Sequence, residues 1–302
     1  MNDNTRKLIR YVCEGDVKMS QFWARHILNA TNTEKDKRFC TSMLEKLDEA
    51  EKRKSEIPDA LQSLLLAEPP ENYSDKKYLQ RDCDKSITDK VLKAYKAANK
   101  LAEKNIRYYP ALLLHGESGC GKTELARYIA YKAKLPFLLV RFSNLVNSFL
   151  GETQKNISKI FDFAKTMPCV LCFDEIDAIG LTRGDGKTDI AEMSRVVIAL
   201  MQELDRLSNN IILIGTTNRY GDLDPALVRR FPLNTQVTPL SDKETYSLTE
   251  KFLTYADEMP ENLTEWLTEN GLNGENTAYK VIKTCTEHVI EQVLNGDVGN
   301  ET

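Results

Sequence analysis

The sequence predicts an α/β fold, in which a parallel sheet with helices on both faces follows an all-helical N-terminal domain and precedes a small C-terminal helical domain. Three observations predict it: short apolar runs alternate with amphipathic stretches from residue 110 onward, residues 5–66 have helical periodicity, and strand-like runs stop after residue 240. Alternating strands and helices are typical of a parallel sheet with both faces covered. The 302 residues suffice for one good core with one or two smaller parts.

The first predicted domain, residues 1–70, is all-helical. The segments "VKMSQFWARHILNA" and "FCTSMLEKLDEAEKRK" repeat apolar residues at the spacing of one helix face. These apolar positions are Val17, Phe22, Trp23, Ile27, Leu28, Phe39, Met43, Leu44 and Leu47. The stretch "AEPPENYSD" at 67–75 interrupts the pattern with a proline pair, which places the domain boundary there.

The second predicted domain, residues 71–240, contains the sheet, and the third, residues 241–302, is helical. Four apolar runs are predicted to be buried strands: "ALLLH" at 111–115, "FLLVRF" at 137–142, "CVLCF" at 169–173 and "IILIG" at 211–215. The segments "KTELARYIAYKA" and "DIAEMSRVVIALMQELDRL" between them are predicted amphipathic helices. Three more helices are predicted after "FPLNTQVTPL", within 241–259, 261–270 and 275–294.

The charge balance argues against nucleic acid as the partner. A net charge of −4 and a pI near 5.6 leave no whole-chain basic field to attract nucleic acid or an anionic membrane. The start, "MNDNTRKLIRYV", has no apolar signal-peptide core, and no apolar run reaches the roughly 18 residues that span a bilayer. We therefore expect a soluble, cytoplasmic protein with no membrane partner.

The cysteines are expected to be reduced thiols. Their number, seven, is odd, and they are scattered along the chain. The pair in "CVLC" at 169–172 has the spacing of a redox or zinc motif, but it lies inside a predicted buried strand and lacks a second pair. Because tetrahedral zinc needs four ligands, a metal site here is the weaker interpretation.

The motif "GESGCGKT" follows a predicted strand and opens a predicted helix, which is the context of a phosphate-binding loop. Its glycines let backbone N–H groups approach phosphate oxygens, and the helix N-terminus adds positive potential. Lys122 is expected to bridge the β- and γ-phosphates, and the Thr123 hydroxyl to ligate Mg²⁺. The alternative, a glycine-rich turn that binds nothing, is disfavoured by this context. The nucleotide-binding candidates are Gly116, Glu117, Ser118, Gly119, Cys120, Gly121, Lys122, Thr123 and Glu124.

Acidic and amide side chains follow two further strands. In "CVLCFDEID", Asp174 suits a water-mediated hold on Mg²⁺, and Glu175 suits the polarisation of the water that attacks the γ-phosphate. Asp177 is expected to cap a helix. Asn218, at the end of "IILIGTTN", is expected to orient the same water from the other side. Ligands of open α/β sheets bind beyond the carboxyl ends of the strands, where these groups are predicted to meet.

Two adjacent arginines end the segment "LDPALVRRF". Asp224 and Pro225 are predicted to begin a short helix as its N-cap and first residue. Arg229 and Arg230 can be interpreted in two ways. They complement the helix dipole, which is worth about 0.3–1 kcal/mol, or one of them is an arginine finger that acts on a neighbour's nucleotide.

The ordered motifs "GESGCGKT", "CFDEID", "TTNR" and "LDPALVRRF" resemble an AAA+ ATPase of the AAA family proper, which includes katanin- and spastin-like remodellers and AAA proteases. The resemblance covers the middle and C-terminal parts and implies a P-loop NTPase fold, a helical lid, Mg²⁺-ATP as cofactor and a homohexamer. The first 70 residues lie outside it. Two departures matter: Arg229 and Arg230 are adjacent rather than separated, and the lid after Arg230 has no arginine to sense the nucleotide. Which arginine is the finger therefore stays open.

By this resemblance, "NSFLGET" occupies the position of a pore loop. Phe149, Leu150 and Gly151 correspond to the aromatic, hydrophobic and glycine residues that line the centre of a hexamer, and "RGDGKTD" at 183–189 to a second, more polar loop. Phe149 and Leu150 would grip an extended polypeptide through non-directional apolar contact. The alternative is that Phe149 folds back into the core, which is the usual fate of a lone loop aromatic.

Three functions remain open. The preferred one is a Mg²⁺-ATP-driven homohexamer that remodels, unfolds or threads a protein client. The second is an ATP-dependent oligomeric switch that regulates a partner effector, for example a separately encoded protease. The third, a nucleic-acid loader, is disfavoured by the acidic balance and by the Phe-Leu-Gly sequence.

Overall fold

The computed structural model describes residues 3–13, 17–30, 36–55, 57–106, 108–141, 145, 150–180 and 187–298. The chain divides into two compact units, Met1–Ile57 and Pro58–Thr302. This division differs from the expected domain boundary at residue 70. The reason is that strand β1 (Leu65–Glu68) pairs with the sheet and so places the preceding residues in the second unit. The C-terminal helices belong to the same unit as the sheet.

The first unit contains helices α1 (Asp3–Cys13), α2 (Val17–Ala30) and α3 (Lys37–Ser55). Cys40 is buried, whereas Phe22 and Phe39 are largely exposed. These three helices confirm the helical periodicity predicted for this part of the sequence.

The second unit is built on a sheet whose described strands have the order β1-β3-β4-β5-β2-β6. The four apolar runs formed strands as predicted: β2 (Ala111–His115), β3 (Phe137–Arg141), β4 (Cys169–Asp174) and β5 (Ile211–Thr217). They pair in parallel, as does the edge strand β6 (Leu233–Gln236), while β1 at the other edge is antiparallel to β3. The predicted all-parallel sheet is thus mostly parallel.

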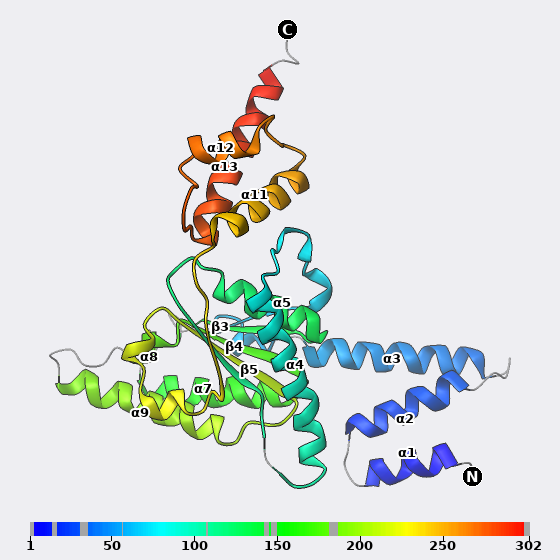
Figure 1. Ribbon diagram of the computed structural model, residues 1–302. Helices are drawn as coiled ribbons and strands as arrows, with labels where there is room; N and C mark the ends of the chain where they lie inside the picture. The colour runs from blue at the N-terminus through cyan, green and yellow to red at the C-terminus, as the bar shows by residue number, and fades with distance from the viewer. Residues whose placement is uncertain are drawn as a thin grey trace. The chain divides into compact units, whose positions relative to one another are not determined.

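Helices connect and cover the strands (Figure 1). The longer ones are α4, α5, α7 and α9, and the short ones are α8, α10 and several 3-10 turns. Their bounds are η1 (Asp59–Leu61), η2 (Pro70–Asn72), η3 (Asp75–Lys77), α4 (Asp82–Ala102), α5 (Lys122–Ala133), α7 (Leu150–Lys165), α8 (Asp177–Gly180), α9 (Lys187–Leu204), η4 (Tyr220–Asp222) and α10 (Pro225–Val228).

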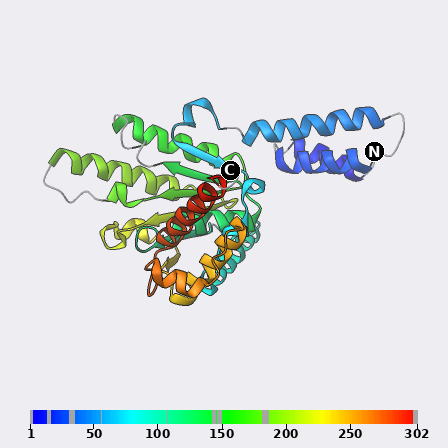
Figure 2. The same cartoon turned by 90° about the horizontal axis from the view of Figure 1, so that it is seen from above.

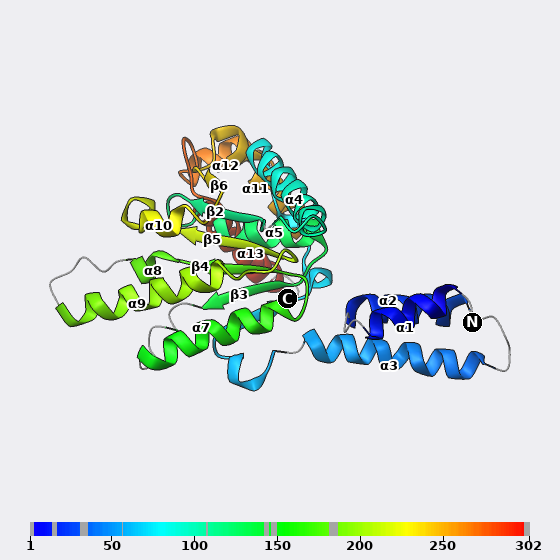
Figure 3. The same cartoon turned by 90° about the horizontal axis from the view of Figure 1, so that it is seen from below.

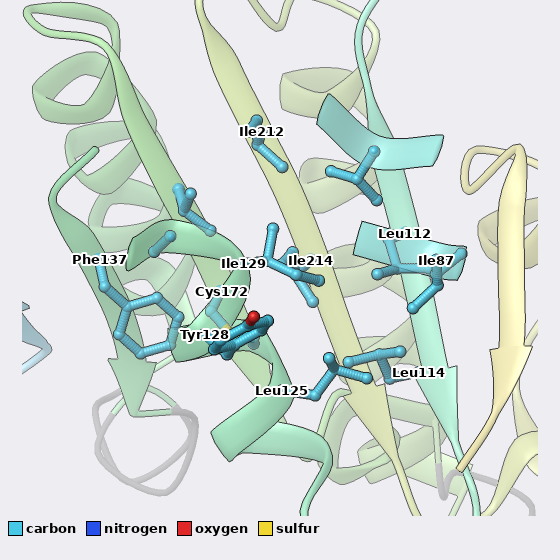
Figure 4. Packing of buried hydrophobic residues seen from close by; sticks show 14 of the residues in the cluster. Ile87, Leu112, Leu114, Leu125, Tyr128, Ile129, Phe137, Cys172, Ile212 and Ile214 are labelled. Atoms are coloured by element: carbon cyan, nitrogen blue, oxygen red, sulfur yellow. The ribbon is translucent and has the colours of Figure 1, made fainter. Parts of the chain in front are cut away.

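Helices cover both faces of the sheet. Alternate residues of each strand point to opposite faces, so neighbouring residues contact different helices. Cys172 of β4 joins the cluster under α4 and α5, while the next residue, Phe173, stacks on Phe161 of α7 at 5.6 Å between ring centroids. Figure 4 shows the first of these layers, and Figure 3 shows α4 and α5 apart from α7 and α9 across the strands. The strands β2, β3, β4 and β5 are therefore apolar at most positions, as buried parallel strands are.

The C-terminal helices α11 (Asp242–Ala256), α12 (Leu263–Glu269) and α13 (Ala278–Val298) form a small helical lid and match the three predicted helices (Figure 2). Ser241 and Glu244 form a capping box that begins α11, and the Asn262 side chain caps α12. Trp266 lies in the buried core of the lid. Among the described helices, none combines the length and the apolar composition that crossing a membrane requires.

Candidate nucleotide-binding site

A cavity of about 730 Å³ lies between the carboxyl edge of the sheet and the lid. The strands β2, β4 and β5 are neighbours or near neighbours and run in parallel, so the residues that follow them meet at one edge. One wall contains the sequence-predicted residues Ser118, Gly119, Cys120, Gly121, Lys122, Thr123, Glu124, Asp174, Glu175 and Asn218. The fold thus brings together the three motifs that lie up to 100 residues apart in sequence.

The loop between β2 and α5 has the backbone that its glycines permit. Gly116, Gly119 and Gly121 have φ values of +146°, +80° and +93°, which side chains rarely adopt. A Cβ on Gly116 would also collide with the carbonyl oxygen of Val237, and one on Gly119 would come within 2.9 Å of the Cβ of Tyr279. Gly116 and Gly119 are therefore required both for conformation and for close approach.

Lys122 lies inside the loop that precedes it. Its Nζ donates hydrogen bonds to the carbonyl oxygens of Gly116 at 3.0 Å and Glu117 at 2.8 Å, and to Oδ1 of Asn218 at 2.6 Å. Burial lowers the pKa of Lys122, while Cys120, Asp174 and two other acids act against that shift. The ammonium is thus held among neutral acceptors at the centre of the cavity wall, where a phosphate would be its stronger partner.

Asp174 and Thr123 place two side-chain oxygen atoms next to each other. The Thr123 hydroxyl donates to Oδ1 of Asp174 at 2.8 Å, and the Thr216 hydroxyl donates to the same oxygen at 2.5 Å. Mg²⁺ is commonly held by one or two protein oxygens together with substrate phosphates and water. Within the described residues, no group of three or more His, Cys, Asp or Glu side chains could hold a metal. The oxygen pair fits a cation whose other ligands come from nucleotide and water.

Glu175 has a strained backbone. Its φ of +54° lies in the left-handed region, which costs a residue other than glycine about 1 kcal/mol or more. Its N–H donates to the Thr216 hydroxyl at 3.0 Å, which helps to hold this conformation, and its side chain is exposed at the cavity. Such strain clusters at functional sites, because the surrounding structure must enforce it.

Asp177 does not precede α8 as a cap but is its first residue. It is 7% exposed, and its Oδ1 has no hydrogen-bond partner within the described part of the chain. Asp224 does cap α10, because its side chain accepts from the N–H of Ala226 at 2.7 Å, and Pro225 is the first residue of that helix, as expected.

The two arginines have different surroundings. Arg230 donates to both carboxylate oxygens of Asp205, at 3.0 and 2.7 Å, and to the carbonyl oxygen of Ala226 at 2.8 Å. The Asp205 carboxylate also raises the pKa of Arg230. The Arg229 side chain is exposed and has no hydrogen bond or ion pair to any described residue. Only Arg229 is thus available to a partner without breaking an intrachain ion pair.

Glu124 is engaged away from the phosphate loop. It accepts a hydrogen bond from the Tyr73 hydroxyl at 2.9 Å and pairs with Arg127 at 3.5 Å, while Glu68 binds the same guanidinium at 2.9 Å. Cys120 is buried beside Lys122, and this burial raises the pKa of its thiol. Cys169 and Cys172 are buried within β4, as expected from their apolar context.

The opposite wall of the cavity comes from residues that no motif marked: Lys77, Tyr78, Leu79, Leu248, Phe252, Ala278, Tyr279 and Ile282. Tyr78 stacks on Tyr128 of α5 at 4.3 Å, and its carbonyl oxygen accepts from Nζ of Lys251 at 2.6 Å. The N–H of Tyr279 donates to the carbonyl oxygen of Gly119 at 2.9 Å. In the sequence, only the aromatic residues in "DKKYLQRD" and "TYSLTEKFLTY" indicate this wall. The apolar positions of the lid have the same pattern as the core of any helical domain.

The structure describes only part of the two segments proposed as pore loops. Phe149 and residues 183–186 lie outside the described residues. Helix α7 begins at Leu150, so the backbone of Leu150 and Gly151 is helical rather than part of a loop, and residues 187–189 likewise begin α9.

Comparison with known proteins bears on the central part of the chain. Residues 112–239 match the family described as "ATPase family associated with various cellular activities (AAA)". Over 141 residues, 47% of this chain, the sequence is 38% identical to an uncharacterized AAA family ATPase, y4kL, of Sinorhizobium fredii, and this match covers 42% of y4kL.

Two further relatives are much longer. Over 121 residues, 39% of this chain, the sequence is 44% identical to the peroxisomal ATPase PEX6 of Dictyostelium discoideum and 41% identical to human PEX6. These matches cover 10% and 12% of the two PEX6 proteins. The chain thus spans less than half the length of each of these curated relatives.

Proposed function

We propose that this chain, whose residues 112–239 match the AAA ATPase family, binds Mg²⁺-ATP, hydrolyses it as a homo-oligomer and uses the cycle to remodel a protein client in the cytoplasm. A hexamer is the oligomer that the sequence resemblance implies. The observation that carries the proposal is the meeting of Lys122, Asp174 and Glu175 on one wall of a single cavity. Asp174 and Glu175 lie at the carboxyl end of β4, and Lys122 begins the helix after the loop that follows β2, at the edge where such sheets bind nucleotides.

The chemistry proposed is the transfer of the γ-phosphoryl group to water. Glu175 would accept the proton of the attacking water as the new P–O bond forms and the bond to ADP breaks. Asn218 would hold that water. Its Oδ1 accepts from Lys122, so a phosphate that attracts the ammonium would free this oxygen for the water.

Thr123 and Asp174 would hold Mg²⁺, Asp174 through a water molecule. Bound there, Mg²⁺ would neutralise charge on the β- and γ-phosphates. The Thr216 hydroxyl serves both acidic residues, since it donates to Asp174 and accepts from the N–H of Glu175. It would therefore keep the metal-binding carboxylate and the base in fixed relation.

Arg229 is the arginine proposed to act on the ATP of a neighbouring copy. Arg230 would instead anchor the end of α10 to Asp205. An exposed guanidinium that pairs with no carboxylate among the described residues is suited to stabilising charge on a phosphoryl group that another subunit supplies.

The nucleotide site itself is tested with Lys122→Ala. The variant should lose most of its ATP binding, because the ammonium lies at the carbonyl oxygens of the phosphate-binding loop itself. Binding of a fluorescent ATP analogue measures the effect. Lys159→Ala, at an exposed position on α7, is the control and should bind normally. Equal binding by both variants would contradict the site.

The client-gripping role is tested with Phe149→Ala. If the ring is exposed at a pore, the variant should fold, assemble and hydrolyse ATP at the basal rate, since neither nucleotide nor arginine contacts change. It should lose client-stimulated hydrolysis and remodelling, because about 1.5–3 kcal/mol of apolar contact is removed per engaged loop.

A core position for Phe149 predicts the reverse result. A buried Phe→Ala substitution costs about 3–5 kcal/mol, so the variant would melt early and lose basal ATPase activity as well. A stable variant that still remodels its client fully would contradict the grip and leave the oligomeric switch as the better function. Thermal melting, ATPase and client-remodelling assays distinguish these outcomes.

A further inference from the structure

Two aromatic rings stack beside the phosphate-binding loop. His115 is the last residue of β2 and directly precedes Gly116, and Tyr220 begins the 3-10 turn after β5. Their ring centroids are 4.3 Å apart with an interplanar angle of 26°. The stack thus joins the residue just before the phosphate-binding loop to the segment that follows Asn218.

Tyr220 also takes part in a hydrogen bond that joins the two ends of the segment that carries Arg229. Nδ2 of Asn234, on β6, donates to the Tyr220 hydroxyl at 2.7 Å. Tyr220 precedes α10, and Asn234 follows it, so this one bond joins the two ends of residues 220–234. Arg229 lies within this closed segment, and its exposed side chain belongs to the residue that directly follows a helix of only four residues.

The segment has a second anchor on its far side. Arg230 binds Asp205, just beyond the end of α9, through two hydrogen bonds. Between the Tyr220 end and the Arg230 end, α10 has little freedom to rotate. The direction of Arg229 therefore depends on both anchors together with the buried side chains of Leu227 and Phe231, because a four-residue helix cannot hold an orientation by itself.

The stack is independent of the contact that nucleotide binding would break. Lys122 links the phosphate loop to Asn218 through one hydrogen bond, for which a phosphate would compete. The contact between the His115 and Tyr220 rings is separate from that hydrogen bond. The stack would thus hold residues 220–234 in place against the phosphate-binding loop after the Lys122 ammonium moves to the phosphates.

We propose that His115 and Tyr220 are positioning residues for Arg229: their stack, closed by Asn234, aims the Arg229 guanidinium at the ATP of a second copy of this chain. This inference rests on the proposed oligomeric ATPase and on the action of Arg229 in trans. Neither ring need touch the nucleotide of its own subunit.

The test places the defect in a copy whose own site is already inactive. Arg229→Ala copies have an intact nucleotide site but supply no arginine, whereas Lys122→Ala copies supply Arg229 but bind no ATP. Mixed assemblies of the two should regain ATPase activity at sites where an intact arginine faces an intact loop. Tyr220→Ala is then added to the Lys122→Ala copy only, and co-assembly is confirmed by native mass spectrometry.

The rescue should fall by about 10- to 100-fold with Tyr220→Ala in the donor copy, as expected when a transition-state contact is misplaced by about 1 Å. Tyr220→Phe in the same copy separates the two contacts: it keeps the stack, loses only the bond to Asn234, and should give a rescue between that of the unaltered donor and that of the Tyr220→Ala donor. A merely local role of Tyr220 at its own nucleotide would leave the rescue unchanged, because the donor copy binds no ATP.

The outcomes test the positioning role of the stack and the action of Arg229 in trans separately. Full rescue by the Lys122→Ala/Tyr220→Ala donor, at normal co-assembly, would overturn the positioning role and leave the trans-acting arginine intact. No rescue in the starting mixture would overturn the trans-acting arginine, and the positioning role with it. The KM for ATP of the single variant Tyr220→Ala should stay within about twofold of wild type while kcat falls, as for an interaction made only in the transition state.

Discussion

Replacing Glu175 by Gln should leave ATP bound and slow its hydrolysis by about 10²- to 10⁴-fold, the usual contribution of a general base. The amide has nearly the shape of the carboxylate but cannot accept the water proton. Single-turnover hydrolysis of radiolabelled ATP, beside binding of the same nucleotide, measures both expectations. The variant is also suited to capturing a client, because it should remain in the ATP-bound state.

The left-handed backbone of Glu175 supplies the control. Glu175→Gln keeps the strained φ of +54° and should melt at the wild-type temperature, so slow hydrolysis could not be attributed to unfolding. Glu175→Gly should be equally slow but more stable, because glycine adopts this conformation without the penalty of about 1 kcal/mol. Glu152→Gln, at an exposed position outside the cavity, should hydrolyse ATP normally. Normal turnover by Glu175→Gln would rule it out as the base.

Replacing Arg229 by Ala should reduce ATP hydrolysis by about 10³- to 10⁵-fold without weakening nucleotide binding to the variant's own site. The loss is expected because the guanidinium stabilises charge that appears only in the transition state. Steady-state ATPase rates and nucleotide affinity, measured on the same assemblies, check the two halves of this expectation. Rescue by Lys122→Ala copies would show that the contact crosses between subunits.

Arg230→Ala is the matched comparison, because the two residues are adjacent and carry the same charge. It removes the ion pair with Asp205, which is a partly exposed pair of the kind worth about 0–1 kcal/mol. We expect a smaller effect on hydrolysis, through a looser α10, and normal nucleotide binding. If Arg230→Ala were the slower variant and Arg229→Ala hydrolysed normally, the assignment of the two residues would have to be exchanged.

The sequence predicted the central fold well because buried parallel strands and phosphate loops are local in origin. "ALLLH" and "CVLCF" are apolar on both faces, as β2 and β4 require, and the helix after "GESGCG" begins at Lys122. The edge strands were harder to predict. β1 is four residues long and continues a helical pattern. β6, "LNTQ", has only one apolar residue, and its alternate residues Asn234 and Gln236 are exposed.

The sequence by itself determined which chemical groups would meet: a lysine, two acids and an amide at the carboxyl ends of parallel strands, where any such sheet must place them. Only the tertiary structure decided how they are held. The bond of Lys122 to Asn218, the stack of His115 on Tyr220 and the lid wall of the cavity join segments about 100 or more residues apart. The choice between Arg229 and Arg230 likewise depended on where Asp205 lies, because a side chain is engaged or free according to neighbours that only folding brings near.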